Sequence, residues 1–375
     1  MFNCRICRNT LEGNTGLIYS GMPPYSQHLP EKPDFSSVDL QIIQCPACGT
    51  VQLLNEPVPY YREVIRAAAY SPEMGEFRRK QFAGWVEKYH LTGKKIFEAG
   101  CGRGEYLQLM QESAPVEVCG VEYGSDSAES ACKSGLHVER IFFDRGDEIL
   151  EKAPFDGFFI LNYLEHIPDF SRFMQGIYNN LKPDAVGLVE VPNFDLMLKK
   201  NMFSEFTIDH LYYFTADSLK RALEIHGFEV LDCQVIWHDY IISAEVKKRL
   251  MLDFSGFKKA EEELFTRLRE FFGDAPVSEC AVWGAGHQAF ALLAASGLNK
   301  KISAIIDSAP FKQNKFAPAG GVKIVSPEVL ENENIGRIVI MAGSYSDEIA
   351  GRLKEIHPGK FKVAIVREND LEIIQ

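Results

Sequence analysis

Apolar segments typical of β-strands alternate with helical patterns over most of the chain. The segments "VEVCGVE", "FDGFFILN" and "VGLVEVP" are separated by stretches with helical spacing, such as "FSRFMQGIYNNLK". Apolar strands that alternate with helices are typical of a parallel sheet covered on both faces. The alternation starts again with "CAVWGAGHQAFALLAASG", "KISAIID", "RIVIMAG" and "FKVAIV". We therefore expect two separate α/β domains.

A chain of 375 residues is longer than one hydrophobic core usually organises, so two or three domains are expected. The first 60 or so residues are rich in Pro, Gly and Cys, with short strand-like pieces such as "LQIIQ" and "TVQLL". The charged stretch "AEVKKRLMLDFSGFKKAEEELFTRLREFF" has a helical pattern that ends at "GDAP". The predicted division is a Cys-rich module at 1–64, an α/β domain at 65–243, and a Rossmann-like domain at 244–375 led by that helix.

The charge of the chain excludes one class of function. The formal net charge is −12 and the pI is near 5.3, whereas sequence-independent binding of nucleic acid requires a basic surface. The N-terminal "MFNCRICRNT" lacks the pattern of a signal peptide, and no apolar run reaches the roughly 18 residues of a membrane span. We expect a cytoplasmic protein that binds neither nucleic acid nor membrane.

Two C-x-x-C pairs lie about 40 residues apart, Cys4 and Cys7 in "CRIC" and Cys45 and Cys48 in "CPACG". Four thiolates satisfy the tetrahedral preference of zinc and leave no open position for water, which predicts a structural zinc. The module is short for an unaided core, so a metal has a physical role there. The alternatives are four reduced cysteines or a redox pair, although C-x-x-C redox chemistry does not require a second pair.

The segment "IFEAGCGRGEY" places Glu98 at the end of a strand and Gly100, Gly102 and Gly104 at alternate positions after it. Glycines let the backbone approach a ligand where a Cβ would collide. The spacing is E-x-G-x-G-x-G, which differs from the G-x-G-x-x-G of dinucleotide-binding folds. It resembles the loop of class I methyltransferases, which bind S-adenosylmethionine.

Two later features agree with that resemblance. Glu122 ends the next strand about 20 residues on, where an acidic side chain can accept hydrogen bonds from ribose hydroxyls. Asn162, Glu165 and His166 follow the strand "FDGFFIL", where it should open onto the cofactor. These features in this order predict binding of S-adenosylmethionine, with a cofactor-free relic of the fold as the alternative.

With these motifs in order, the chain resembles the deoxysugar C-methyltransferases that act on nucleotide-linked keto-sugars. The similar segments are "GMPPYSQHL", "CPACGTVQL", "YYREVIRAAAYSPEM", "VWGAGHQAFALL" and "IIDSAPFKQNKFAPAGGVKIVSPEVL". The resemblance covers nearly the whole length. It implies a class I methyltransferase domain between an N-terminal zinc module and a C-terminal Rossmann-like domain.

The stretch "FTIDHLYYF" matches the family's Y-x-E-H segment, whose His serves as the base. Here Thr207 and Asp209 replace the Tyr and the Glu, while His210 is retained. The resemblance implies that His210 is a base, that Asp209 orients it or binds substrate hydroxyls, and that Tyr70 donates to an enolate oxygen. On the residues alone, a packed core histidine is the favoured interpretation of His210, and Tyr70 could equally be a packing tyrosine. The family's G-G-S-L-R-like strand is not recognisable near "WHDYIISAE".

A second glycine loop, "VWGAGHQAFALL", carries Gly284 and Gly286, and Asp307 ends the following strand about 20 residues later. By spacing this is a credible NAD fingerprint. The resemblance instead implies a domain that holds the nucleotide-sugar, with the helix N-terminus facing the diphosphate. Lys312 and Lys315 in "FKQNKFAP" could add positive charge there or be ordinary surface lysines. His166 is a further candidate for substrate binding.

Three functions remain open. The first is C-methylation of a nucleotide-linked keto-deoxysugar through a base-generated enolate, with S-adenosylmethionine as methyl donor. The second is O- or N-methylation of a nucleotide-sugar or another small metabolite. The third is a non-catalytic or NAD-binding relative. The partner we expect is the nucleotide-linked sugar, and the oligomeric state we expect is a monomer or a homodimer.

Overall fold

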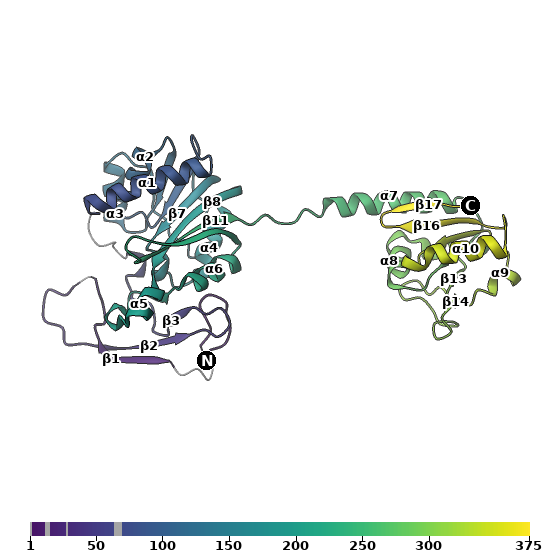
Figure 1. Cartoon of the computed structure of the whole chain (residues 1–375), viewed down its shortest axis with the longest axis horizontal. Coiled ribbons are helices and arrows are strands. Elements are labelled where there is room, and N and C mark those ends of the chain that lie inside the picture. Colours follow the sequence, from purple (N-terminus) through teal and green to yellow (C-terminus); the bar gives the residue numbers. More distant parts are fainter. Residues whose placement is uncertain (1, 12–15, 28, 64–69) are drawn as a thin grey trace. The chain divides into compact units, whose positions relative to one another are not determined.

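A computed structural model of the chain describes residues 2–11, 16–27, 29–63 and 70–375 (Figure 1). It forms two compact units, unit 1 at Met1–Met251 and unit 2 at Leu252–Gln375. The predicted boundary after residue 64 and part of the segment "YYREVIRAAAYSPEM" lie outside the described residues. The three-domain division stays a prediction, because the N-terminal module and the central domain form one unit here.

Unit 1 is built on a seven-stranded sheet with the order β10-β11-β8-β7-β4-β5-β6. Its strands are β4 (Lys95–Ala99), β5 (Glu117–Val121), β6 (Val138–Glu139), β7 (Phe155–Leu161), β8 (Leu181–Pro192), β10 (Phe228–Ile236) and β11 (Ile241–Lys248). Neighbours from β6 to β8 pair in parallel, whereas β11 is antiparallel to both β8 and β10. The chain builds outward from β4 in both directions, as in other doubly wound sheets.

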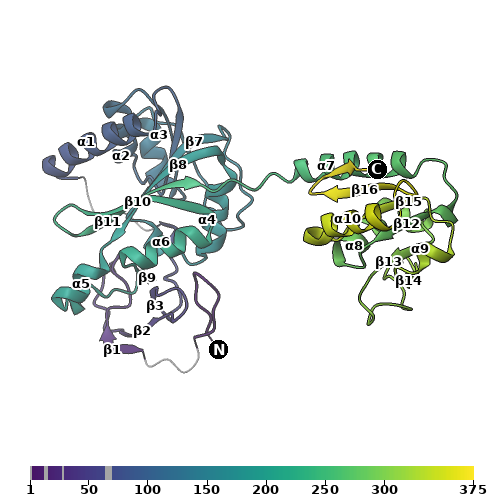
Figure 2. The same ribbon diagram turned by 45° about the vertical axis from the view of Figure 1, so that its right-hand side comes forward.

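Helices cover both faces of this sheet, because alternate strand residues point to opposite sides. The helices of unit 1 are α1 (Pro72–Lys88), α2 (Glu105–Ser113), α3 (Ser125–Lys133), α4 (Phe170–Asn179), α5 (Phe194–Lys200) and α6 (Ala216–Ile225). Residues of α1 and α2 share a core with Ile96 and Phe159 of the sheet. Residues of α4 and α6 share a second core with Phe97 and Phe158, the adjacent strand positions. Figure 2 shows α4 and α6 on the other side of the sheet from α1 and α2. Apolar residues at successive positions of one strand therefore serve two cores.

The prediction of a helix from residue 244 is wrong at its start. Residues 244–248 belong to β11, and the helix α7 begins only at Ser255 and ends at Phe272. β11 is inserted between β8 and β10, so both of its edges are paired and Ala244 and Val246 are fully buried. Glu245 lies between these two residues, and Lys247 and Lys248 follow them. These charged residues made the segment look helical, so its alternating strand pattern was not recognised. This strand occupies the place where the family's expected strand was not recognised.

A second, four-stranded sheet forms the N-terminal module, in the order β1-β2-β3-β9. Its strands are β1 (Leu17–Met22), β2 (Val38–Gln44), β3 (Val51–Leu53) and β9 (Tyr212–Tyr213), all antiparallel. The strands predicted at "LQIIQ" and "TVQLL" are confirmed as β2 and β3. The fourth strand comes from the central part of the chain, where Gln52 pairs with Tyr212. Backbone hydrogen bonds therefore join the Cys-rich module to the segment that follows His210.

Unit 2 is a six-stranded sheet in the order β14-β13-β12-β15-β16-β17, parallel except for the last strand. Its strands are β12 (Cys280–Trp283), β13 (Ala304–Ile306), β14 (Ile324–Val325), β15 (Arg337–Ile340), β16 (Lys362–Arg367) and β17 (Asp370–Ile373). Its helices are α7, α8 (His287–Ser296), α9 (Val329–Asn332) and α10 (Ser346–Ile356). α7 and α8 pack on one face, and residues of α9 and α10 pack on the other. Within the described ranges, no helix has the length and apolar composition needed to cross a membrane.

A buried ion pair fastens α1 to the sheet of unit 1. Arg78 Nη1 lies 2.6 Å from Glu190 Oε2, and both side chains are fully buried. Gln81 Nε2 and Ser243 Oγ also donate to Glu190 Oε1, at 2.5 and 3.1 Å. The pair thus ties α1 to β8 and β11, and either charge would be left buried if its partner were removed.

We predict that Arg78→Met lowers the free energy of unfolding of unit 1 by about 3 to 5 kcal/mol, because Glu190 stays buried without its cation. The double variant Arg78→Met/Glu190→Met should recover most of that loss. Chemical denaturation, with hydrogen–deuterium exchange to assign the change to unit 1, measures it. The control is Arg79→Met, since the half-exposed Arg79–Glu112 pair should contribute less than about 1 kcal/mol. A double variant as unstable as Arg78→Met alone would contradict the assignment.

Candidate active site

The candidate site lies where the chain reverses its direction of building along the seven-stranded sheet, between β4 and β7. Ligands of doubly wound sheets bind at the carboxyl ends of the strands at such a point. Glu98 is the penultimate residue of β4 and is fully buried, and Asn162 directly follows β7. β4 and β7 are hydrogen-bonded neighbours, so the loops that follow them leave the sheet side by side.

The three glycines after β4 all have positive φ, at 73°, 57° and 86°, but they serve different purposes. A Cβ on Gly100 would lie 2.4 Å from the ring of Tyr163, and a Cβ on Gly104 would lie 2.3 Å from Leu136. These two glycines therefore permit packing within the protein. A Cβ on Gly102 would meet nothing closer than Glu105 Oε2 at 3.9 Å. Gly102 is the one of the three whose missing side chain leaves open space for a ligand.

Glu122 shapes the loop that it faces. Its Oε2 accepts a hydrogen bond from the Gly102 N–H at 2.9 Å, and its Oε1 accepts one from the Gly124 N–H at 2.7 Å. The side chain is largely buried, at 7% exposure. Each carboxylate oxygen can accept more than one hydrogen bond, so an oxygen that holds a loop amide can also accept one from a hydroxyl group of a ligand. Glu122 could hold a ribose while it keeps the glycine loop in place.

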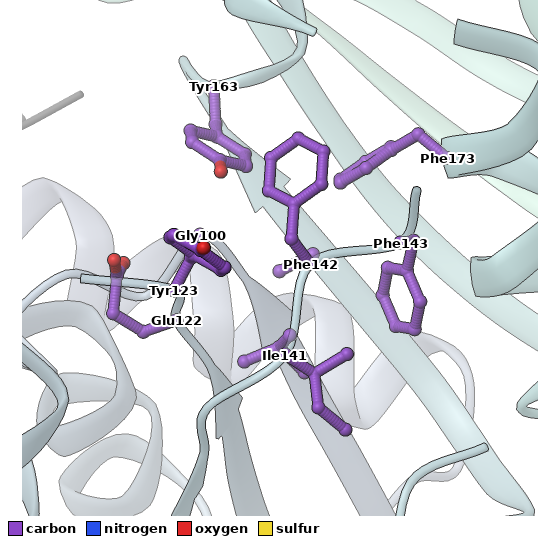
Figure 3. A pocket seen from close by; sticks show the side chains of 10 residues that line it. Gly100, Glu122, Tyr123, Ile141, Phe142, Phe143, Tyr163 and Phe173 are labelled. Carbon is purple, nitrogen blue, oxygen red and sulfur yellow. The ribbon is translucent and has the colours of Figure 1, made fainter. Parts of the chain in front are cut away.

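An aromatic pocket adjoins Gly100 and Glu122 (Figure 3). It is lined by Ala99, Gly100, Val121, Glu122, Tyr123, Ile141, Phe142, Phe143, Tyr163 and Phe173. Such a pocket, with apolar walls and one carboxylate, suits a nucleoside whose base packs on rings and whose hydroxyls need an acceptor. The predicted S-adenosylmethionine contains such a nucleoside, so these residues fit it.

Asn162 is placed beside this pocket by strained backbone, with a φ of 47°. Its N–H donates to the Glu190 carbonyl at 2.9 Å, which continues the ladder between β7 and β8. Its Oδ1 is buried and accepts no hydrogen bond from the part of the chain that is described. A buried amide oxygen without a donor is costly, and a donor on a bound ligand would remove that cost.

Two histidines lie together just beyond the pocket. The ring centroids of His166 and His210 are 4.8 Å apart in an edge-to-face arrangement. His166 Nδ1 lies 2.9 Å from the Asp209 carbonyl oxygen, which can only accept, so Nδ1 carries the proton and Nε2 carries the lone pair. Burial lowers the pKa of His166, and burial followed by the neighbouring His166 lowers the pKa of His210 to about 3. Both rings are therefore neutral near pH 7.

Asp209 is 4% exposed, and its carboxylate turns toward the N-terminal module. The Tyr60 hydroxyl donates to Asp209 Oδ1 at 2.8 Å. Asp209 Oδ2 is buried and has no donor among the described residues. The structure therefore joins Asp209 to His166 through its backbone carbonyl, while one carboxylate oxygen stays available to a hydroxyl of a substrate.

Tyr70 packs against the helices of the central domain. Its ring stacks on Tyr106 of α2 at 5.7 Å, and a Cβ on Gly75 of α1 would lie only 2.8 Å from it. Its role in catalysis stays a prediction. The contacts recorded for this ring show it as part of the core around α1 and α2.

The four predicted metal ligands come together in the N-terminal module. Sγ atoms of Cys4 and Cys48, and of Cys7 and Cys45, lie 3.6 Å apart, and all four lie within 4.8 Å of one another. A tetrahedron with Zn–S bonds of about 2.3 Å has S–S edges of about 3.8 Å, so the cluster fits zinc. Gln52 Nε2 donates to Cys4 Sγ at 3.2 Å, a contact that favours a thiolate.

The second glycine loop lies in unit 2. A Cβ on Gly284 would lie 2.5 Å from the Met341 carbonyl oxygen, whereas Gly286 begins α8 with open space around it. Asp307 accepts hydrogen bonds from the Ala285 and Ala309 N–H groups at 2.8 and 2.9 Å, and Lys312 Nζ lies 3.0 Å from Asp307 Oδ2. Burial raises the pKa of Asp307, but the two amides and Lys312 together lower it below its usual value. Lys312 is thus paired with Asp307, the acidic residue that would bind the ribose hydroxyls of NAD.

Sequence reasoning missed some residues of this site. Tyr60 lies in the quoted segment "YYREVIRAAAYSPEM" but was given no role, because its partner Asp209 lies 149 positions away. Tyr163 was missed as a wall of the pocket, although it lies in the quoted segment next to Asn162. Glu165 was noticed in sequence but given no role, and its Oε1 lies 3.9 Å from His166 Nε2.

We predict that the purified protein carries about one zinc ion per chain, and that Cys45→Ser abolishes this binding. Structural zinc contributes on the order of 10 kcal/mol to small metal-stabilised modules, so the variant should lose the N-terminal sheet while the glycine loop stays protected. Elemental analysis and hydrogen–deuterium exchange measure the two effects. Cys132→Ser, at an exposed cysteine outside the cluster, is the control. Absence of zinc in protein purified without chelator would contradict the prediction.

We predict that Gly102→Val abolishes binding of S-adenosylmethionine, because its side chain would fill the open space that the ligand requires. Glu122→Ala should weaken binding by about 1 to 3 kcal/mol through lost hydrogen bonds. Titration calorimetry measures both. Gly135→Val is the control, since Gly135 also has a positive φ and open surroundings but lies outside the pocket. Unchanged affinity in both site variants would place the cofactor elsewhere.

Comparisons with known proteins agree with this geometry. Residues 74–232 match a family described as a methyltransferase domain, and residues 241–365 match a family described as a C-methyltransferase C-terminal domain. The chain is 26% identical to C-methyltransferase NovU of Streptomyces niveus, over 96% of this chain and 95% of the relative. It is 25% identical to a probable S-adenosylmethionine-dependent methyltransferase of Mycolicibacterium smegmatis, over 43% of this chain and 62% of that protein.

Solved structures that match part of the chain include an S-adenosylmethionine-dependent methyltransferase of Mesorhizobium loti. It is 15% identical, with a TM-score of 0.36 over 44% of this chain and 98% of its own. The plantazolicin methyltransferase BpumL, solved with SAH, is 13% identical, with a TM-score of 0.38 over 48% of this chain and 86% of its own. The predicted fold class, a class I methyltransferase domain with a second C-terminal α/β domain, is confirmed. The chain is therefore an S-adenosylmethionine-dependent methyltransferase, and its two matched domains and its full-length relative support its place in a C-methyltransferase family.

Proposed function

We propose that the protein is a C-methyltransferase that acts on a nucleotide-linked keto-deoxysugar. The observation that carries this proposal is the pair of neutral histidines beside the cofactor pocket, of which His166 is buried and His210 is half-buried. The N–H of His166 donates to the carbonyl of Tyr163, a wall of that pocket, at 3.1 Å, so pocket and histidines are neighbours in the fold. The full-length relative named as a C-methyltransferase supports the reaction class, and the resemblance described above supports the sugar.

Methylation of carbon requires a base, because a C–H group next to a ketone is only weakly acidic. In the proposed reaction, a ring nitrogen of His210 accepts the proton from that carbon, and the electrons of the C–H bond form an enolate. The enolate carbon would then form a bond to the methyl carbon of the donor, whose C–S bond breaks with its electron pair left on sulfur. The ketone forms again, and the proton on the histidine passes to solvent. Bound S-adenosylmethionine would supply the electrophilic methyl group on its sulfonium. The neutral ring of His210 has a lone pair that can accept a proton at cellular pH. Its lowered pKa makes it a weak base, so the proposed step requires a nearby anion, such as Glu165, to stabilise the protonated ring.

The contacts of Asp209 and Glu165 support a role for each, whereas the role of Tyr70 rests on the resemblance described above. Asp209 Oδ2 is buried and has no donor among the described residues, so it is suited to accept a hydrogen bond from a hydroxyl of the substrate. Glu165, near His166, is placed to stabilise a protonated imidazole. Tyr70 is proposed as a donor to the enolate oxygen. Zinc in the four-cysteine cluster is proposed to be structural, since four sulfur ligands leave no open position.

We assign the nucleotide part of the substrate to unit 2, through Gly284, Gly286 and Lys312. Gly286 leaves open space at the start of α8, where backbone N–H groups can approach a diphosphate. The Lys312–Asp307 pair makes this loop a poor site for NAD, because NAD would need Asp307 to bind its ribose. The Asp307 carboxylate already accepts hydrogen bonds from two backbone N–H groups and from the Lys312 ammonium group. A mass-spectrometric screen of nucleotide-linked keto-sugars for the added mass of one methylene unit tests the substrate.

O-methylation of a small metabolite is the second candidate, because the chain is also 32% identical to a ubiquinone biosynthesis O-methyltransferase of Pasteurella multocida. That match covers 26% of this chain and 45% of the relative. A neutral histidine can also accept a hydroxyl proton. Exchange of a carbon-bound proton with solvent separates the two reactions, since only the C-methyltransferase removes such a proton.

We predict that His210→Asn leaves the fold and the affinity for S-adenosylmethionine unchanged while turnover falls by roughly 10² to 10⁴. Wash-in of solvent deuterium at the sugar carbon should stop as well, because that exchange reports proton removal without methyl transfer. His226→Asn is a control for loss of a half-buried histidine, since His226 contacts Ser171 and Ala222 away from the pair. If the folded His210→Asn variant exchanged the proton at the wild-type rate, His210 would not be the base.

A further inference from the structure

The segment that carries Asp209 and His210 is held on one side by the N-terminal module. Ser26 Oγ and Thr207 Oγ1 lie 2.5 Å apart, and the Leu53 N–H donates to the Leu211 carbonyl at 3.0 Å. Pairing of β3 with β9 follows directly. The module thus contacts the segment at both ends, before and after the two residues of interest.

Between these ends, Tyr60 makes the one described contact from the module to the acidic side chain. Its hydroxyl donates to Asp209 Oδ1 at 2.8 Å and accepts from the Ser26 N–H at 3.2 Å. Burial, and after it the bond to Asp209, raises the pKa of Tyr60 to about 12. The phenol is therefore protonated and acts as the donor. Since Asp209 Oδ2 has no donor in the described chain, Tyr60 supplies the carboxylate's only described hydrogen bond from another residue.

Asp209 passes this constraint to the histidine pair through its backbone. Its carbonyl accepts from His166 Nδ1 at 2.9 Å, which selects the tautomer whose Nε2 lone pair is on the unbonded side. The ring of His166 in turn contacts that of His210. A path of direct contacts therefore runs from Tyr60 through Asp209 and His166 to His210.

We propose that Tyr60 is a positioning residue, which couples the four-cysteine module to the histidine pair by holding Asp209 in place. Its role in turnover rests on the proposed function, whereas its effect on the histidine rings does not. Among the described residues, Tyr60 is bonded to Asp209 and to neither histidine ring, so the proposed effect passes through Asp209. The module would then be part of the catalytic machinery as well as a separate folded element.

The first test reads the histidine rings without any substrate. The variants are Tyr60→Phe, which removes only the hydroxyl, and the control Tyr19→Phe. Tyr19 lies in β1 of the same module, packs on Phe203 and Phe206, and has no recorded hydrogen bond of its hydroxyl in the described chain. Ring nitrogen signals are recorded by ¹⁵N NMR of histidine-labelled protein and assigned with His166→Gln and His210→Asn.

We expect Tyr60→Phe to shift the His166 and His210 ring signals, and Tyr19→Phe to leave them unchanged. Zinc content of both variants should equal that of the wild type, which shows that the module is folded. Ring signals in Tyr60→Phe that coincide with those of the wild type would overturn the proposal. That result would leave the proposed methyltransferase function untouched, because no turnover is measured.

The second test uses turnover on the keto-sugar found by the substrate screen. Tyr60→Phe should lower kcat about tenfold, which corresponds to about 1.4 kcal/mol, while affinity for S-adenosylmethionine is unchanged. Asp209→Asn and the double variant complete a cycle, in which the double variant should lose less than the product of the two single losses. Fully multiplicative losses would show that Tyr60 does not act through Asp209. If no keto-sugar is turned over by the wild type, the proposed function fails while the NMR result stands.

Discussion

The pairing of β4 with β7 is the constraint on which the rest of the site depends. These two parallel strands are neighbours although about 55 residues separate them, and each delivers a loop to the same edge of the sheet. β4 delivers the glycine loop, and β7 delivers Asn162 and the turn with Glu165 and His166. The proposed cofactor pocket and His166 are adjacent because the sheet ladder brings the two strand ends together.

A second level of organisation concerns polar groups that the fold buries. Glu122 is buried but accepts two loop amides, and Glu190 is buried against Arg78. Asn162 Oδ1 and Asp209 Oδ2 are buried without a described donor. Buried groups with a hydrogen-bond or charge partner stabilise the fold. Buried groups without a partner cost free energy unless a ligand supplies one. Both unsatisfied oxygens flank the place where cofactor and substrate are proposed to meet.

The structure shows that the N-terminal module depends on the central part of the chain. As a sequence it is a zinc-binding element that could fold apart from the rest. In the structure its sheet needs β9 from the central part of the chain, and Tyr60 bonds to Asp209. A metal in this module would therefore support the geometry around His166 and His210 as well as the module itself.

The sequence by itself determined the features that depend on local pattern. Apolar alternation predicted the two α/β sheets, the C-x-x-C spacing predicted the thiol cluster, and the glycine loop predicted the methyltransferase fold and its cofactor. These signals are readable because each is encoded within a few adjacent residues. The end of strand β11 was predicted to be helical, because its charged residues fit the pattern of an exposed helix. Ala244 and Val246 are buried there because β11 pairs with β8 on one edge and with β10 on the other.

Only the tertiary structure decided how distant residues combine. It showed that Gly100 and Gly104 serve internal packing while Gly102 leaves space for a ligand. It also joined Tyr60 to Asp209 and placed His166 against His210. The physical reason is that burial, hydrogen-bond partners and the resulting pKa values depend on contacts between segments that are far apart in the chain. No local pattern in the sequence specifies those contacts.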